Sequence, residues 1–258
     1  MSNGRRSPYS PIQRFRRASQ DEDAKIFKTF KVISQKVPNF YQARNSVYPI
    51  IKPWNWIKRA RDSLQAETKS NLICKQIQNL PIGVLYALYN EEKGILRYVS
   101  SLDLAVWQLN EKELMKYAKE NLIKKVGLIE KNEPLFTETQ TGVFYCNKLN
   151  HLTSSLLAVP DVFHMIPLKS NNYVVLCPQS DVIYVSHCQD QRGLCIIGEL
   201  SLRSARSNTL LSSKPIRITK NGLNLYEASI VRNEASVPCS EDQLKTCKKA
   251  VFKKSRKF

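Results

Sequence analysis

Apolar positions recur every three or four residues most clearly between Asn110 and Gly127. Asn110 and Glu113 have the spacing of a capping box, in which each side chain accepts a hydrogen bond from the other residue's backbone N–H. The periodic positions that follow are Leu114, Tyr117, Ala118, Asn121, Leu122 and Lys125. This spacing predicts a helix that ends at Gly127.

Two further segments have a helical pattern. Residues 24–33 carry apolar side chains at helical spacing behind an acidic run, which suits the positive end of a helix dipole. Their apolar positions include Ile26, Phe30 and Ile33. Residues 152–166 are largely apolar but contain Pro160, which interrupts a helix. We therefore expect a packing helix in the first segment and a broken helix in the second.

Short apolar runs of strand length, bounded by turn residues, fill much of the remaining chain. The expected strands are residues 48–52, 80–89, 95–99, 142–146, 173–177, 182–188, 194–197, 214–219 and 223–226. Asn221-Gly222 between the last two is a strong hairpin signal, and a polar loop ending at Gly94 joins an earlier pair. Because hairpins join antiparallel neighbours, we predict an α+β fold with a mainly antiparallel sheet and two or three covering helices.

The length of 258 residues fits one large domain with appended ends. The first twenty residues are rich in arginine, serine and proline, which is typical of a disordered arm. We expect a basic arm over residues 1–20, one α+β domain over residues 21–240 and a basic tail over residues 241–258. No internal repeat is present in the sequence.

Several segments occur in the same order as in a family of bacterial proteins. They are residues 48–52, 85–89, 99–107, 114–118, 120–122, 154–157, 174–185 and 196–201. In this order they resemble the YtpQ-like family, a domain of unknown function, over residues 45–230. The resemblance implies a cytosolic α+β domain without established catalytic residues. This chain differs in its shorter region before residue 48 and in its basic C-terminal tail.

The net charge of +18 is concentrated at the two ends of the chain. Residues 1–20 carry five arginines, residues 243–258 carry seven lysines and arginines, and neither segment contains an acid. These segments supply 12 of the 18 net charges, so the domain between them is only mildly basic. The charge therefore favours a polyanionic partner for the ends rather than for the domain.

Composition argues against membrane and secreted classes. No apolar run approaches the roughly 20 residues that cross a bilayer, and no apolar segment follows the first arginines as in a secretory signal. The seven cysteines are odd in number and have no repeated spacing, which favours a reducing compartment. We expect a cytoplasmic protein, or a nuclear one if the protein is directed to a host cell.

Patterns for metal, nucleotide and thiol chemistry are weak or missing. The sequence has no Cys-x-x-Cys, no His-x-x-x-His and no glycine-rich phosphate loop, so we expect no metal site and no cofactor. A cysteine nucleophile would most naturally be Cys177 or Cys188, with His164 or His187 as its base. Both cysteines follow apolar runs, which favours a place in the core.

Four polar residues are weak catalytic candidates for an enzyme of undescribed type: Asp103, Asn121, Asp181 and His187. Asp103 lies near the start of the segment that contains Trp107, where a helix cap or a first-turn acid is the plainer role. Asn121 lies on the apolar face of the predicted helix and needs a hydrogen-bonding partner there. Asp181 is more typical of an acid that closes a turn. The enzyme hypothesis requires that these side chains meet in space.

The C-terminal tail gives a more physical argument about function. Its basic residues flank Phe252, which suits attraction to phosphates with an aromatic ring available for stacking. The expected polyanion-binding residues are Arg14, Arg16, Arg17, Lys248, Lys249, Lys253, Lys254, Arg256 and Lys257. The leading hypothesis is a binding module whose basic ends engage nucleic acid or another polyanion, such as an acidic protein. A nuclear address in the tail and a merely solubilising end are the alternatives.

Overall fold

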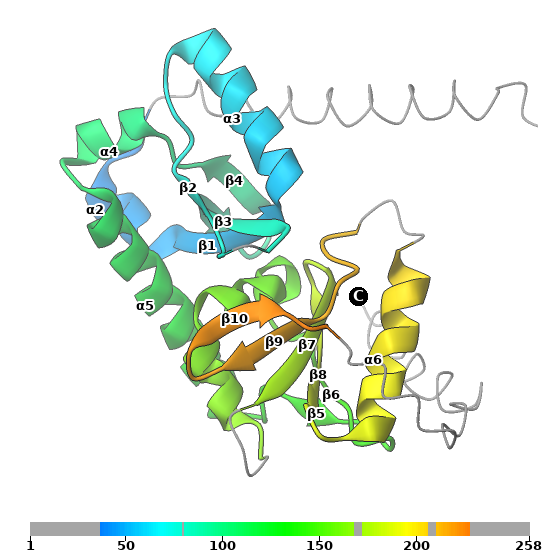
Figure 1. Ribbon diagram of the computed structural model, residues 1–258. Coiled ribbons are helices and arrows are strands. Elements are labelled where there is room, and N and C mark those ends of the chain that lie inside the picture. The colour runs from blue at the N-terminus through cyan, green and yellow to red at the C-terminus, as the bar shows by residue number, and fades with distance from the viewer. Residues whose placement is uncertain (1–36, 79, 168–171, 206–209, 228–258) are drawn as a thin grey trace, which may run out of the picture.

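The computed structural model describes residues 37–78, 80–167, 172–205 and 210–227. Within them the chain forms two antiparallel sheets, each with helices packed against it (Figure 1). The predicted α+β fold with antiparallel pairing is confirmed, although the strands divide between two sheets and more helices are present than expected. The predicted helix over residues 24–33 lies outside the described residues.

The first sheet has the strand order β1-β3-β2, with β4 also paired to β3. Its strands are β1 (Val47–Pro53), β2 (Cys74–Gln76), β3 (Ile82–Asn90) and β4 (Gly94–Tyr98). The hairpin expected around Gly94 is present as β3 and β4. Pro49 and Pro53 lie within β1, which is an edge strand and therefore tolerates the missing N–H of proline.

Helices cover both faces of the first sheet (Figure 1). They are α2 (Phe40–Ala43), η1 (Arg44–Ser46), α3 (Trp54–Thr68), α4 (Ser101–Trp107) and α5 (Glu111–Glu130). One face packs Leu85 against Ile57 and Leu64 of α3, while Tyr86, one residue further along β3, packs against Leu104 and Leu114 of α4 and α5. This alternation follows from the two-residue period of a strand.

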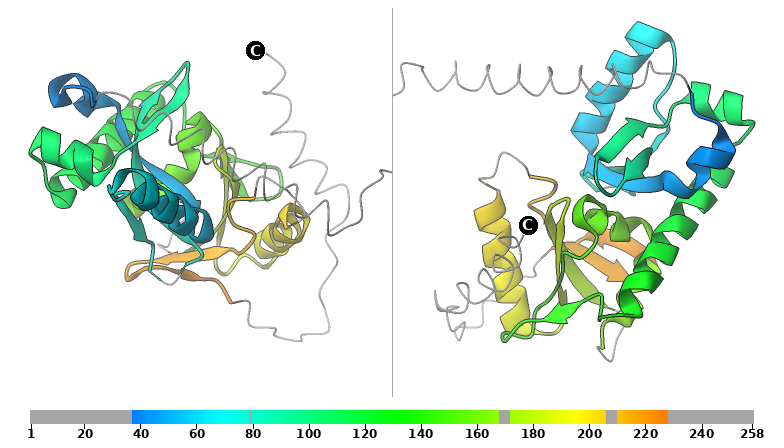
Figure 2. Two further views of the ribbon diagram at one scale, coloured as in Figure 1. Left: turned by 90° about the horizontal axis from the view of Figure 1, so that it is seen from above. Right: turned by 180° about the vertical axis from the view of Figure 1, so that it is seen from behind.

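The longest of these helices, α5, begins as the sequence predicts. Asn110 Oδ1 accepts a hydrogen bond from Glu113 N at 3.0 Å, and Glu113 Oε2 accepts one from Asn110 N at 2.9 Å. The helix does not stop at Gly127 but continues to Glu130. A glycine costs a helix interior only about 0.5–1 kcal/mol, so the three remaining residues can still join the helix. With this length, α5 runs from the first sheet to the second (Figure 2).

The second sheet has the strand order β10-β9-β7-β8-β6-β5. Its strands are β5 (Thr137–Glu138), β6 (Phe144–Cys146), β7 (Tyr173–Gln179), β8 (Val182–His187), β9 (Ile216–Thr219) and β10 (Gly222–Leu225). The hairpin predicted at Asn221-Gly222 is confirmed. Gly222 has a φ of +119°, and a Cβ atom there would lie 2.5 Å from Gln78 Nε2. Glycine therefore lets this hairpin approach the loop after β2.

The helix α6 (Gln191–Ser204) corrects the strand predicted over residues 194–197. A four-residue apolar run is compatible with a buried strand or with one turn of a helix, and periodicity over so few residues does not separate them. In the structure Ile196 and Ile197 are buried against β7 and β8, whereas Cys195 faces solvent. Residues 191–204 therefore form an amphipathic helix on the outer face of the second sheet.

Two 3₁₀-helices, η2 (Asn150–Ala158) and η3 (Pro160–Met165), occupy the region where a broken helix was expected. Pro160 is the first residue of η3, which explains the break. Leu156 of η2 belongs to the same buried core as Ile51 of β1 and Val185 of β8. The two sheets thus share one core, with η2 inside it. No helix within the described residues has the length and apolar character needed to cross a membrane.

Candidate functional site

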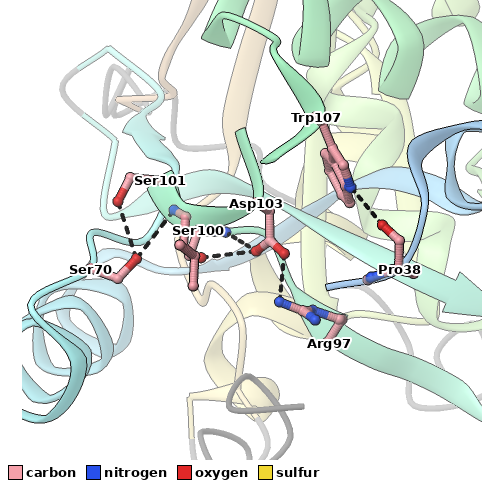
Figure 3. Close-up of polar contacts among 8 residues, drawn as sticks. Pro38, Ser70, Arg97, Ser100, Ser101, Asp103 and Trp107 are labelled. Atoms are coloured by element: carbon pink, nitrogen blue, oxygen red, sulfur yellow. Dashed lines mark hydrogen bonds and ion pairs between the residues drawn. The ribbon is translucent and has the colours of Figure 1, made fainter. Parts of the chain in front are cut away.

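The carboxylate of Asp103 is the centre of a buried polar group beside the first sheet (Figure 3). Its Oδ1 accepts a hydrogen bond from Arg97 Nη2 at 2.6 Å. Its Oδ2 accepts two more, from Ser100 N at 2.8 Å and from Ser100 Oγ at 2.9 Å. Asp103 has no exposed surface, and Arg97 and Ser100 are 5% and 1% exposed. We call these three residues the Asp103 cluster.

Local sequence explains most of the Asp103 cluster. Ser100 is the N-cap of α4 and Asp103 is its third residue, so the two form a capping box and Asp103 has the cap role that its position suggests. Arg97 comes from β4, where it lies opposite Leu88 on the face of the sheet that packs against α4. The ion pair therefore joins a strand to the helix that follows it.

Further hydrogen bonds hold both ends of α4. At its start, the hydroxyls of Ser70 and Ser101 lie 3.1 Å apart, and Asn71 N donates to Ser101 Oγ at 3.0 Å. At its end, Trp107 Nε1 donates to the carbonyl oxygen of Pro38 at 2.8 Å (Figure 3). The helix is thus tied to the segment after α3 and to the segment before α2.

The geometry of Asp103 suits a structural role better than acid–base catalysis. A general base must reach a substrate proton, but both oxygens of Asp103 already accept hydrogen bonds within the protein and neither faces solvent. The Arg97 guanidinium offsets much of the cost of burying the carboxylate. Removing either partner would leave an uncompensated buried charge, so the pair fixes the position of α4.

Asn121 also has a structural role. Its Nδ2 donates to the carbonyl oxygens of Arg44 at 2.6 Å and Val47 at 2.9 Å, and the residue is 8% exposed. These carbonyls lie where η1 leads into β1. Asn121 therefore supplies the hydrogen-bonding partner that its place on the apolar face of α5 required.

The other two catalytic candidates lie at opposite ends of β8. Asp181 is exposed in the turn between β7 and β8, and His187 is the last residue of β8. At about 3.3 Å per residue, six residues of strand separate their backbones by about 20 Å. His187 Nδ1 accepts a hydrogen bond from Gln189 N at 3.2 Å. The structure therefore does not bring Asp181 and His187 together.

The buried cysteines are poor nucleophiles. The Cys177 thiol donates to the carbonyl oxygen of Gln179 at 3.2 Å, and burial raises its pKa well above the usual value. Burial likewise raises the pKa of Cys146 to about 11. Since the thiolate is the reactive form, both side chains behave as core residues at neutral pH. Among the described residues, no three His, Cys, Asp or Glu side chains gather in a way that could hold a metal ion.

A second polar group, at the start of α6, was missed by the sequence analysis. Ser186 Oγ donates to Asp190 Oδ2 at 3.3 Å, and Asp190 directly precedes the helix. A Cβ atom on Gly193 would lie 2.2 Å from Ser186 Oγ and 2.3 Å from Asp190 Oδ2, so the space next to Gly193 is already filled. An acid before a helical run is a recognised start pattern, but the strand predicted over residues 194–197 hid it.

The predicted polyanion-binding residues, from Arg14 to Arg17 and from Lys248 to Lys257, lie outside the described residues. The described part of the chain holds 21 lysines and arginines against 16 aspartates and glutamates. Its excess of 5 positive charges is small beside the +18 of the whole chain. Most of the positive charge is therefore carried by the remaining segments.

Comparison with known proteins adds no assignment. No family model matches the chain, and no curated protein or solved structure gives a significant match. The resemblance to the YtpQ-like family stays a prediction, and the function has to be argued from the residues of this chain.

Proposed function

We propose that this protein is a non-enzymatic binding module whose basic terminal segments engage nucleic acid or another polyanion. The observation that carries the proposal is the segregation of charge. Residues 1–20 and 243–258 hold 12 positive charges without one acid, whereas the described residues are close to balanced. Dense positive charge of this kind binds phosphate backbones by releasing their counterions.

The polar groups of the domain support a non-enzymatic role. The side chains of Asp103 and Asn121 form their hydrogen bonds with partners within the protein. Asp181 and His187 lie at opposite ends of one strand. The four residues that could have formed an active site are therefore better explained as parts of a scaffold.

The two ends of the described chain suggest how a scaffold would use its basic segments. Val37 packs beside Trp107 and Ala118 on the first-sheet side, and Tyr226 packs on the second-sheet side with its N–H donating to Pro215 at 3.0 Å. The basic segments therefore attach to different parts of the body. Two segments that bind one polyanion would strengthen each other, because the second segment binds at a high effective concentration.

Binding of a fluorescent single-stranded DNA and of an RNA of equal length to the full chain tests this proposal. One variant replaces Arg14, Arg16 and Arg17 with glutamine. A matched control replaces three exposed lysines of α5 with glutamine: Lys112, Lys116 and Lys124. The slope of log K against log salt should fall by about 0.7–0.9 for each phosphate that the variant no longer neutralises. We expect weaker binding and a lower slope for the arginine variant and near-normal binding for the control.

A third variant neutralises the six basic residues between Lys248 and Lys257, and it should lose more affinity than the arginine variant. The proposal fails if the full chain shows no salt-sensitive binding at low ionic strength. It also fails if the α5 variant loses as much affinity as the terminal variants. We place this activity in the cytoplasm because the odd number and scattered spacing of the seven cysteines favour a reducing compartment.

A further inference from the structure

Three consecutive residues of η2 have buried hydroxyls without a hydrogen-bonding partner. Thr153, Ser154 and Ser155 are each 0% exposed. Within the part of the chain that the structure describes, none of their three hydroxyl oxygens has a partner within hydrogen-bond distance. Burying a hydroxyl without such a bond is costly, so η2 is destabilised in its observed position.

In a regular 3₁₀-helix, three consecutive hydroxyls would not face one common ligand. A 3₁₀-helix has three residues per turn, so successive side chains point about 120° apart around its axis. The surroundings of η2 differ accordingly, because it contacts β1, β8 and α5. The unfavourable free energy of burying the hydroxyls is therefore distributed around the helix, and the hydroxyls do not line a single polar pocket.

The backbone of η2 is also unusual. The helix has nine residues, whereas 3₁₀-helices longer than three or four residues are uncommon because their hydrogen bonds are poorly aligned. Its first residue, Asn150, has a φ of +50°, a left-handed conformation that asparagine adopts more readily than most residues other than glycine. The length of this 3₁₀-helix and its buried hydroxyls thus point to the same strained segment.

This strained segment lies between the two sheets. Leu156 belongs to the shared core, and Ser154 N donates to the carbonyl oxygen of Ser180 at 2.9 Å, in the turn before β8. A local opening of η2 would give its hydroxyls access to water, and it would also expose the fully buried Leu152, Leu156 and Leu157. The energy needed for opening is reduced by what the unpaired hydroxyls cost in the closed state.

We propose that η2 opens locally before the rest of the domain unfolds, and we call it a conformational connector because it lies in the core that both sheets share. This device is separate from polyanion binding by the terminal segments and does not depend on it. The three hydroxyls set the fraction of molecules in which η2 is open, because they favour the open state and contribute no hydrogen bonds to the closed one.

Hydrogen exchange of the full chain, followed by mass spectrometry, tests the connector directly. Residues 150–158 should exchange at least tenfold faster than the buried face of α5, although both contribute fully buried side chains such as Leu156 and Leu122. Equal protection in the two segments would overturn the proposal.

Variants test whether the hydroxyls cause the opening. The triple variant Thr153→Val, Ser154→Ala and Ser155→Ala should raise the urea midpoint and slow exchange in η2 about tenfold or more. The control Ser186→Ala removes an equally buried hydroxyl that does have a partner, Asp190, and should lower the midpoint without slowing η2. A lower midpoint for the triple variant, or unchanged exchange in η2, would show that the hydroxyls do not favour opening.

Discussion

The Asp103 cluster and η2 both contain fully buried polar side chains. The Asp103 carboxylate has hydrogen-bonding partners, whereas the η2 hydroxyls have none among the described residues. Asp103 and Ser100 are 0% and 1% exposed, and every oxygen of the Asp103 carboxylate has a donor. Ser154 and Ser155 are both 0% exposed, and their hydroxyls have no partner among the described residues. Burial alone therefore does not say what a polar group does. Its partners decide whether it holds the fold together or makes it easier to open.

Asp103→Ala is the substitution with the largest expected effect on stability. It leaves the Arg97 guanidinium buried without its carboxylate and removes the Asp103 half of the capping box, while Ser100 stays as the N-cap of α4. We expect a loss of about 3–5 kcal/mol in the free energy of unfolding, measured by urea denaturation. The double variant Arg97→Met with Asp103→Leu removes both charges and should be far less destabilised. A loss below about 1 kcal/mol for Asp103→Ala would mean that the cluster does not hold α4.

Asn121→Leu tests a second satisfied group, one that joins α5 to the start of β1. The buried carbonyl of Val47 and the part-buried carbonyl of Arg44 would lose their donor, so we expect a loss of about 2–4 kcal/mol. The control Asn132→Leu removes an exposed amide that donates to Leu128 O and should change stability by less than about 0.5 kcal/mol. Equal effects of the two variants would contradict the structural role of Asn121.

Alkaline pH tests the region around α4 without a mutation, because a buried tyrosine there ionises at high pH. Burial raises the pKa of Tyr86, which packs near α4, to about 12, with a smaller contribution from Glu111. A raised pKa gives stability that is complete below the unfolded value near 10 and is lost as the pH rises to about 12. We expect this group to contribute about 3 kcal/mol of the loss, so Tyr86→Phe should lose less by about that amount, while Tyr98 and the other buried tyrosines still contribute. The η2 hydroxyls do not titrate there, so an alkaline loss in Tyr86→Phe as large as in the unaltered chain would argue against this assignment.

The sequence predicted those parts of the fold that depend on neighbouring residues. The capping box of α5 and the hairpin at Asn221-Gly222 are local patterns, and both are present. The run from Leu194 to Ile197 was assigned to a strand because four apolar residues fit either structure, and only packing against the second sheet shows the helix. The helix α3 was not predicted, although its buried residues Ile57, Ala60 and Leu64 have helical spacing.

The polar sites, too, could be predicted only where they depend on neighbouring residues. The cap role of Asp103 could be inferred from its position, but its ion pair with Arg97 depends on how β4 packs against α4. The two carbonyls that Asn121 binds lie more than 70 residues away in the chain. Thr153, Ser154 and Ser155 look like ordinary helix residues, and only the shared core reveals that their hydroxyls lack partners.

A paired comparison of Ser100→Ala and Ser155→Ala tests the contrast between the two regions most directly. Both substitutions remove one hydroxyl from a fully buried position, and the two differ in whether that hydroxyl has a partner. We predict urea midpoints that move in opposite directions, with a loss of about 1 kcal/mol for Ser100→Ala and a gain for Ser155→Ala. A loss of similar size in both variants would contradict the account.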